Sequence, residues 1–175
     1  MSDASKDETP NLRRHQDSFA WQGVERLAYK QDGDAPFRDV SRQILFSRTD
    51  LAGELRYFEV GPGGHTTLER HDHVHGVVIV RGRGRCLVGS DVSEIGPLDL
   101  VTIPGGTWHQ FRAAPDEPLG FLCLVDAARD RPVLPTAQEM TALRAVPEIA
   151  AFLDGSSIGP KNGIRFSRKS DAITM

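Results

Sequence analysis

Residues 61–82 read GPGGHTTLERHDHVHGVVIVRG and hold four of the six histidines in the chain. Three of them, His71, His73 and His75, alternate with other residues. Side chains two positions apart point to the same face of an extended strand. The spacing therefore predicts three imidazoles on one face of a strand, next to the apolar run VVIV.

Short apolar segments that resemble strands lie on both sides of this stretch. Clusters of Gly, Pro and Asp separate them, as in PGG at 104–106 and PDEP at 115–118. Many short strands with turn residues between them are typical of an all-β sandwich or barrel. The predicted strands are residues 42–47, 54–60, 74–81, 85–88, 100–103, 109–113 and 119–125.

The C-terminal part of the chain has a different pattern, which predicts short helices. Thr136 and Glu139 have the spacing of a capping box, which predicts a helix of about ten residues. Pro147 can begin a second short helix that ends at Gly155. The predicted organisation is a flexible arm at 1–19, a barrel domain at 20–130, short helices at 131–155 and a mobile tail at 156–175.

The composition fits one globular domain of 175 residues, with 39% hydrophobic and 26% charged residues. The net charge of −3 argues against a strongly basic surface for nucleic acid. No apolar run approaches the roughly 18 residues of a membrane-spanning helix, and the polar start MSDASKDETP does not resemble a secretory signal. We therefore expect a cytoplasmic protein that binds neither nucleic acid nor membranes.

Cysteine usage agrees with a reducing compartment. Cys86 and Cys123 lie in the apolar, strand-like runs RCLVG and FLCLVD, far from any CxxC spacing. Free cysteines in such runs behave as small buried hydrophobic residues. A reduced, buried pair without a disulfide is expected.

A second segment completes a pattern that is known from one family. Residues 98–113 read LDLVTIPGGTWHQFRA. Together with residues 61–82 they resemble the two motifs of the cupin superfamily, which are small β-barrels with a metal site built by both motifs. The resemblance covers about residues 40–126.

The first family motif is Gly, five residues, His-x-His, three or four residues, Glu, six residues and Gly. Every spacing fits without a gap if the chain is aligned at Gly63, Glu69, His71, His75 and Gly82. In this alignment Glu and His have exchanged places, because Glu69 stands at the first His position and His75 at the Glu position.

The second family motif is Gly, five residues, Pro-x-Gly, two residues, His, three residues and Asn. Pro104, Gly106 and His109 match it at the family spacing. Leu98 replaces the family's Gly and Ala113 replaces its Asn. Neither replacement removes a metal ligand.

Two other assignments of the ligands remain open. If His71 and His73 form the His-x-His pair, a Glu is needed near positions 77–78, where the chain has Val77 and Val78. Alternatively, His73 binds the metal and Glu69 does not, which gives a site with four histidines. We favour the alignment with Glu69.

The resemblance implies an all-β cupin barrel, a jelly-roll-like double-stranded β-helix, that holds one divalent transition metal per chain. The ligands would be Glu69, His71, His75 and His109, with His73 as a catalytic residue that moves a proton. Imidazole and carboxylate ligands suit Mn, Fe or Ni first, with Zn, Co or Cu as alternatives. A homodimer is the assembly that the family implies.

The function that the resemblance implies is a metal-dependent enzyme for a small organic molecule. Dioxygenase chemistry is the first expectation, and isomerase or lyase chemistry is the second. A cupin that binds or senses a small ligand without turnover is the alternative, because the fold alone defines no substrate. Arg56 and Tyr57, on opposite faces of a predicted strand, are candidates to contact a substrate anion or phenol.

Overall fold

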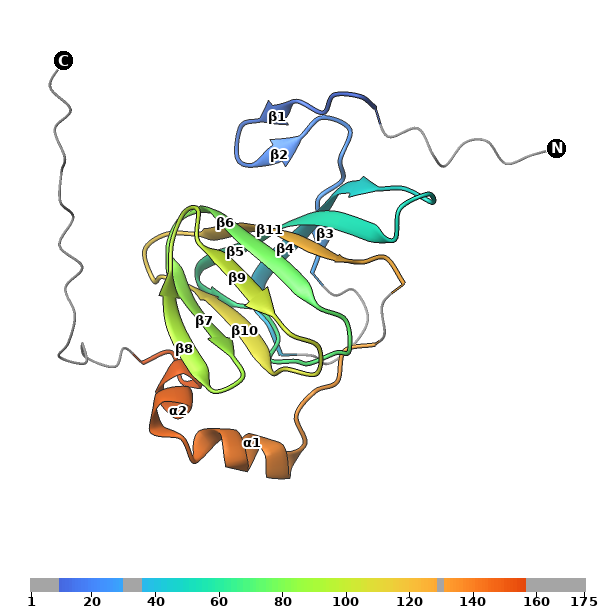
Figure 1. The fold of residues 1–175 in the computed structure, drawn as a ribbon. Coiled ribbons are helices and arrows are strands. Elements are labelled where there is room, and N and C mark those ends of the chain that lie inside the picture. Colours follow the sequence, from blue (N-terminus) through green and yellow to red (C-terminus); the bar gives the residue numbers. More distant parts are fainter. Residues whose placement is uncertain (1–9, 30–35, 129–130, 157–175) are drawn as a thin grey trace, which may run out of the picture.

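The protein is described by a computed structural model over residues 10–29, 36–128 and 131–156, and antiparallel strands dominate these ranges (Figure 1). Two short helices follow the strands. The elements are β1 His15–Gln16, β2 Ala20–Trp21, β3 Leu27–Ala28, β4 Arg38–Ser47, β5 Gly53–His65, β6 His75–Arg81, β7 Gly84–Val88, β8 Asp91–Ile95, β9 Leu100–Ile103, β10 His109–Ala113, β11 Leu119–Asp126, α1 Ala137–Arg144 and α2 Pro147–Leu153.

The main sheet has the strand order β8-β7-β10-β5-β11-β6-β9, and β4 and β3 extend it beyond β5. Strand β5 links the two parts of the sheet, because it pairs with β4 and β11 along its length and with β10 at His65. The sheet curls around a shared interior (Figure 1). The predicted all-β fold is confirmed.

The interior is apolar because alternate residues of the strands point into it. Val77 and Ile79 of β6 have no exposed surface. Phe111 of β10 and Phe58 of β5 stack on either side of Phe121, with ring centroids 4.7 and 5.4 Å away. Burial of one such side chain contributes about 1.5–3 kcal/mol to stability, so this cluster holds the walls of the barrel together.

The two helices cover the outside of the barrel through a second apolar cluster. Ile149 and Phe152 of α2 pack with Leu68 and Leu87. Helix α1 begins as predicted, because the Thr136 side chain accepts a hydrogen bond from the Glu139 N–H while the Glu139 carboxylate accepts one from the Thr136 N–H. Pro147 is the first residue of α2, and Gly155, with φ 74°, follows its last turn.

Each of the seven predicted strands overlaps an observed strand, and the differences lie in polar or very short segments. Strand β8 was not predicted, because its sequence DVSEI is largely exposed and lacks an apolar face. Strands β1 and β2 form a hairpin across the predicted boundary between arm and barrel. Phe19 and Trp21 of this hairpin pack on the buried ring of Tyr57, with centroids 5.7 and 5.0 Å apart.

The predicted tail at 156–175, apart from Ser156, and the first nine residues of the predicted arm lie outside the described residues. The domain boundaries therefore stay predictions.

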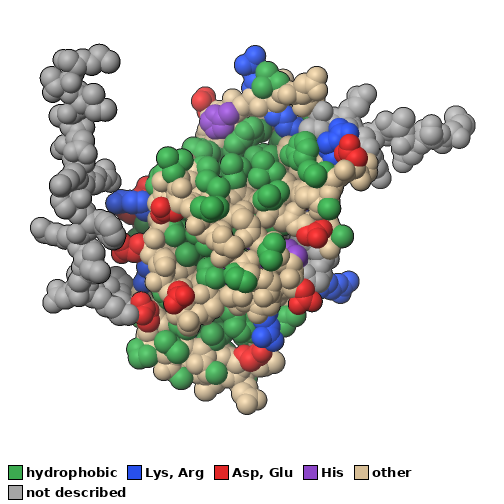
Figure 2. Space-filling view, in the orientation of Figure 1, with side chains coloured by type: hydrophobic (Ala, Val, Ile, Leu, Met, Phe, Trp, Pro, Cys, Tyr) green, Lys and Arg blue, Asp and Glu red, His purple; other side chains and the backbone are tan. Residues whose placement is uncertain are grey.

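None of the helices in the described ranges has the length and apolarity that a membrane span requires. Figure 2 shows hydrophobic side chains on the outer face above β6 and β9, and exposed apolar residues there include Leu98 and Leu100.

Candidate metal centre

Histidines from two strands and from the bend before β6 meet at one end of the interior. His75 is the first residue of β6, and His109 is the first residue of β10 on the other wall. His71 and His73 precede β6 in a bend, so the prediction that all three alternating histidines lie on a strand is wrong for these two. Their side chains nevertheless reach the same place as His75.

The bend is held by the glycine loop after β9. The Gly106 N–H donates to the His71 carbonyl at 2.7 Å. A Cβ atom at position 105 would lie 2.1 Å from the Asp72 carbonyl oxygen, so only glycine allows this approach. Gly106 has φ 71°, which also favours glycine. The Pro-x-Gly motif therefore positions His71 as well as leading into His109.

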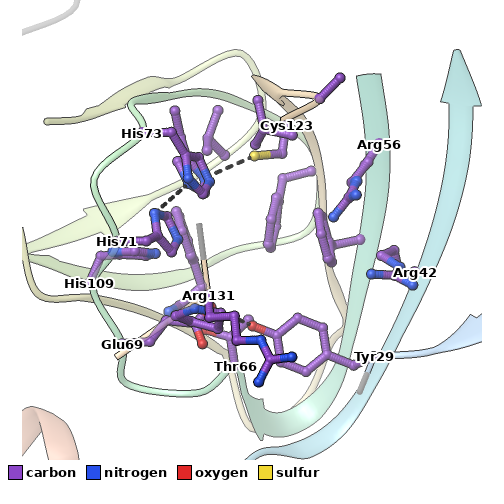
Figure 3. A pocket seen from close by; sticks show the side chains of 18 residues that line it. Tyr29, Arg42, Arg56, Thr66, Glu69, His71, His73, His109, Cys123 and Arg131 are labelled. Carbon is purple, nitrogen blue, oxygen red and sulfur yellow. Dashed lines mark hydrogen bonds between the residues drawn. The ribbon is translucent and has the colours of Figure 1, made fainter. Parts of the chain in front are cut away.

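The imidazole rings are stacked closely. The rings of His71 and His73 lie 3.9 Å apart with 2° between their planes, and His75 lies 4.4 Å from His71. His109 meets His71 edge-on at 4.9 Å. Figure 3 shows His71, His73 and His109 together on one side of a pocket.

The described residues contain one cluster of ligand atoms that could hold a metal ion. His71, His75 and His109 each offer a nitrogen within 4.8 Å of the other two. Nε2 of His75 and Nδ1 of His71 are 3.3 Å apart. Since metal–nitrogen bonds are about 2.0–2.1 Å long, two neighbouring ligands at a right angle stand about 3 Å apart. The spacing suits one transition-metal ion.

The protonation of the cluster also suits a metal. Burial, followed by the charges of the neighbouring imidazoles, lowers the pKa of His71 to about 4 and that of His75 to about 2. Both rings are therefore neutral at pH 7 and keep a lone pair for coordination. Neutral imidazole is the form that binds metals.

One hydrogen bond fixes the tautomer of His109. Its Nδ1 atom lies 2.9 Å from the carbonyl oxygen of Thr107. Because a carbonyl only accepts, Nδ1 carries the proton and Nε2 keeps its lone pair. This arrangement is usual for histidines that bind metals.

Glu69 and His73 line the same pocket but are not members of the three-nitrogen cluster. Glu69 is buried and forms a backbone bridge with His109. Its Oε1 accepts a hydrogen bond from the Tyr29 hydroxyl at 3.3 Å. His73 is partly exposed and stacks on His71. Which of the two provides a fourth ligand stays a prediction.

The pocket has a volume of about 750 Å³, which is in the range for a small organic ligand. The predicted Arg56 faces it, whereas Tyr57 faces the opposite side and packs under the β1–β2 hairpin. Arg42 and Arg131 also line the pocket, and no sequence signal distinguished them from surface arginines.

Cys123 is the functional candidate that the sequence interpretation missed. Both cysteines are buried and neither forms a disulfide, as expected, but the Cys123 side chain lines the pocket. Its Sγ lies 3.3 Å from Nδ1 of His75 (Figure 3). The signal was present in the strand alternation, because position 123 shares a face with the buried residues Phe121 and Val125.

A curled antiparallel sheet with a histidine cluster at one end defines a small cupin barrel. Residues 56–125 match the family model of the cupin domain. The chain belongs to the cupin family. One relative is a 1-methylthio-D-xylulose 5-phosphate methylsulfurylase of Rhodospirillum rubrum. It is 61% identical to this chain over 155 residues, which are 89% of this chain and 98% of the relative.

Two crystal structures of related proteins agree with the fold. A cupin-2 domain protein from Rhodospirillum rubrum has 61% identity and a TM-score of 0.75, over 82% of this chain and 97% of that one. A cupin 2 conserved barrel domain protein from Rhodopseudomonas palustris has 56% identity and a TM-score of 0.76, over 81% and 97% of the two chains.

Proposed function

We propose that this chain is a metal-dependent enzyme that removes the methylthio group from 1-methylthio-D-xylulose 5-phosphate. The name of the R. rubrum relative suggests the substrate, and the similarity extends over 98% of that relative. The observation that carries the proposal is the thiol of Cys123 inside the pocket, 3.3 Å from a ring nitrogen of His75. A thiolate is a nucleophile that can form a sulfur–sulfur bond with the methylthio group as this group leaves the sugar carbon.

The proposed reaction begins with the Cys123 thiolate, which attacks the sulfur of the substrate. A sulfur–sulfur bond forms and the bond between sulfur and C1 breaks. The electron pair left on C1 delocalises into the C2 carbonyl as an enolate, and a proton added at C1 gives the 1-deoxyketose phosphate. Cys123 is left as a methyl disulfide, so the sugar carbon is reduced and the cysteine sulfur is oxidised.

An external thiol completes the cycle. Its thiolate attacks the methyl disulfide, takes the methylthio group as a new disulfide and returns Cys123 as a thiolate. The net reaction consumes one thiol and one substrate. It yields one 1-deoxyketose phosphate and one mixed methyl disulfide, so atoms and electrons balance.

His75 belongs to the histidine cluster and also contacts the proposed nucleophile, Cys123. A neutral imidazole that gives Nε2 to a metal keeps its proton on Nδ1, and this atom of His75 faces Sγ of Cys123. Donation of this hydrogen bond favours the thiolate. His73, partly exposed in the pocket, is proposed as the group that moves a proton to C1.

The metal would be held by His71, His75 and His109, with Glu69 proposed as the fourth ligand and His73 as the alternative. We propose Mn, Fe or Ni, with Zn, Co or Cu as alternatives, because imidazole and carboxylate ligands suit these ions. Bound at this site, the ion supplies a Lewis acid for a carbonyl oxygen.

The test is turnover of 1-methylthio-D-xylulose 5-phosphate with dithiothreitol, with the phosphorylated product followed by ³¹P NMR and mass spectrometry. Wild-type protein and Cys86→Ser are expected to form the 1-deoxyketose phosphate, while Cys123→Ser forms none. Cys86 is a matched control because it is also buried and burial raises its pKa to about 11. Full turnover by Cys123→Ser would contradict the proposal.

Measurements on the same reaction mixture distinguish the proposed reaction from dioxygenase chemistry and from ligand binding without turnover. Dioxygenase chemistry, which the resemblance implied, requires dioxygen uptake during product formation, whereas the proposed reaction consumes none. A non-catalytic ligand-binding cupin would bind the sugar phosphate and release it unchanged. An oxygen electrode and the product spectrum distinguish the three.

A further inference from the structure

Three arginines line the pocket that contains the histidine cluster: Arg42, Arg56 and Arg131. Figure 3 shows Arg42 and Arg56 on the side opposite His71 and His109. The first of them lies on β4 and the second on β5. The pocket therefore has one wall of imidazoles and one wall of guanidinium cations.

The strand register explains why two of these arginines lie together. Arg42 is paired with Phe58, and Ile44 is paired with Arg56. Directly paired residues share a face, so Arg42 and Arg56 are diagonal neighbours on the inner face of β4 and β5. Rigid strands, rather than loops, position both guanidinium groups.

The charges on this wall are not fully balanced by the protein. Arg56 forms a buried ion pair with Glu54. Arg42 is half-buried, and its buried Nε has no hydrogen-bond partner in the described parts of the chain. A buried donor without a partner is costly, and the structure gives no ion pair of Arg42 with an acid in these described parts, so its guanidinium charge is available to an anion in the pocket. Arg131 adds a third cation to the pocket. Glu69 also lines the pocket, and its carboxylate accepts a hydrogen bond from the Tyr29 hydroxyl.

We infer that Arg42, with Arg56 and Arg131, binds the phosphate group of the substrate, a phosphate monoester dianion at the end of an open-chain sugar. The planar guanidinium fork matches two phosphate oxygens at once, and such charge-assisted hydrogen bonds are strong. The inference rests on the proposed function, because that reaction has a sugar phosphate as its substrate.

The position of the nucleophile agrees with this orientation. Cys123 of β11 is paired with Arg56 of β5, and β4 is the next strand. Neighbouring strands lie about 4.8 Å apart, so the backbones of Arg42 and Cys123 are about 10 Å apart across the sheet and offset by two residues along it, and the long Arg42 side chain covers part of this distance. An extended five-carbon sugar spans this separation, with C1 at the sulfur and the C5 phosphate at Arg42.

Binding of D-xylulose 5-phosphate and D-xylulose to the metal-loaded protein tests the inference without turnover. We expect calorimetry to show that wild-type protein binds the phosphorylated sugar at least 10-fold more tightly. Arg42→Gln should lose about 10–100-fold of this affinity, the range for one charge-assisted hydrogen bond, and Arg42→Lys should lose less. Binding of D-xylulose should be unchanged in both variants.

Arg48→Gln is the matched control, because Arg48 follows the same strand and forms an exposed ion pair with Asp50. Arg48→Gln should keep the wild-type preference for D-xylulose 5-phosphate over D-xylulose. Because it removes the same charge as Arg42→Gln, it separates the loss of a contact in the pocket from a change in net charge. Arg42 is a cleaner target than Arg56, whose replacement leaves Glu54 buried without this partner. If Arg42→Gln fails to fold, two measurements still decide the question: the affinity of Arg42→Lys for D-xylulose 5-phosphate, and competition of inorganic phosphate against D-xylulose 5-phosphate for the wild-type protein.

Wild-type protein that binds both sugars equally would overturn the inference. So would an undiminished preference in folded Arg42→Gln. Failure of the proposed function looks different: the Arg42-dependent preference for the phosphorylated sugar persists, but 1-methylthio-D-xylulose 5-phosphate is not converted. That result supports the phosphate site and removes the reaction.

Discussion

At the scale of single residues, His75 joins the two chemical parts of the pocket. One ring nitrogen faces His71 at 3.3 Å and the other faces the Cys123 sulfur at the same distance. Burial keeps the pKa of His75 near 2, so the ring stays neutral and can serve both contacts at pH 7. A metal ligand and a nucleophile are thereby coupled through one side chain.

The choice of fourth ligand is a prediction at this scale. Glu69→Gln should lower the metal content of purified protein, whereas His73→Ala should keep it and lose activity. Glutamine preserves an oxygen that can accept from the Tyr29 hydroxyl, so the variant removes charge with little change in packing. Elemental analysis of protein purified without chelators checks both. Loss of metal from His73→Ala but not from Glu69→Gln would show that the favoured alignment is wrong.

The residues that the sequence predicted best are those with a spacing signal. His71, His75 and His109 stand at motif spacing, and their nitrogens meet. Cys123 and Arg42 belong to no spaced motif: strand alternation indicated only that Cys123 faces inward, and an arginine within a strand is common. Only the pairing of β4, β5 and β11 brings them to one pocket. That pairing depends on contacts between distant parts of the chain.

At the scale of elements, the loop after β9 controls the histidine bend. Gly105 lies close to the Asp72 carbonyl, and the Gly106 N–H donates a hydrogen bond to the His71 carbonyl. Strand alternation predicted the gathering of the histidines but placed His71 and His73 on a strand. The loop contact explains the difference, because it draws residues 71 and 72 toward β9 before β6 begins.

Gly105→Ala should therefore weaken metal binding although it removes no ligand. Its new Cβ would lie 2.1 Å from the Asp72 oxygen, so the bend must shift and His71 with it. We expect a loss of about 10–100-fold in metal affinity, as for other residues that orient ligands. Competition with a chromogenic chelator measures this loss.

Gly76→Ala provides the comparison for that variant. Gly76 follows His75 directly, yet a Cβ there meets no atom within 4 Å. Its metal affinity should stay near the wild-type value. Equal affinity in both glycine variants would show that the loop does not position His71.

At the scale of the whole molecule, the curled sheet sets two chemically different walls against each other. The histidines enter from β10 and from the bend before β6, and the arginines enter from β4 and β5. Short apolar segments separated by turn residues predicted an all-β sandwich or barrel, and the resemblance to the two cupin motifs specified the barrel. The polar edge strand β8 and the β1–β2 hairpin were not predicted, since their stability comes from pairing and aromatic contacts rather than from a pattern.

The family resemblance implies a homodimer, so we predict that two copies of the chain associate in solution. Sedimentation equilibrium of the full chain should give a mass near twice the 19.2 kDa of one chain. The measurement should be repeated at high salt, because salt screens exposed charge pairs but does not weaken apolar contacts. A mass of one chain under all conditions would contradict the dimer.

The central claim, that Cys123 takes the methylthio group, is tested most directly by intact-protein mass spectrometry after one turnover without any added thiol. We predict one equivalent of 1-deoxyketose phosphate and a protein heavier by one methylthio group in place of hydrogen, mapped to Cys123 and reversed by dithiothreitol. Product formed in several equivalents by protein of unchanged mass would contradict the claim.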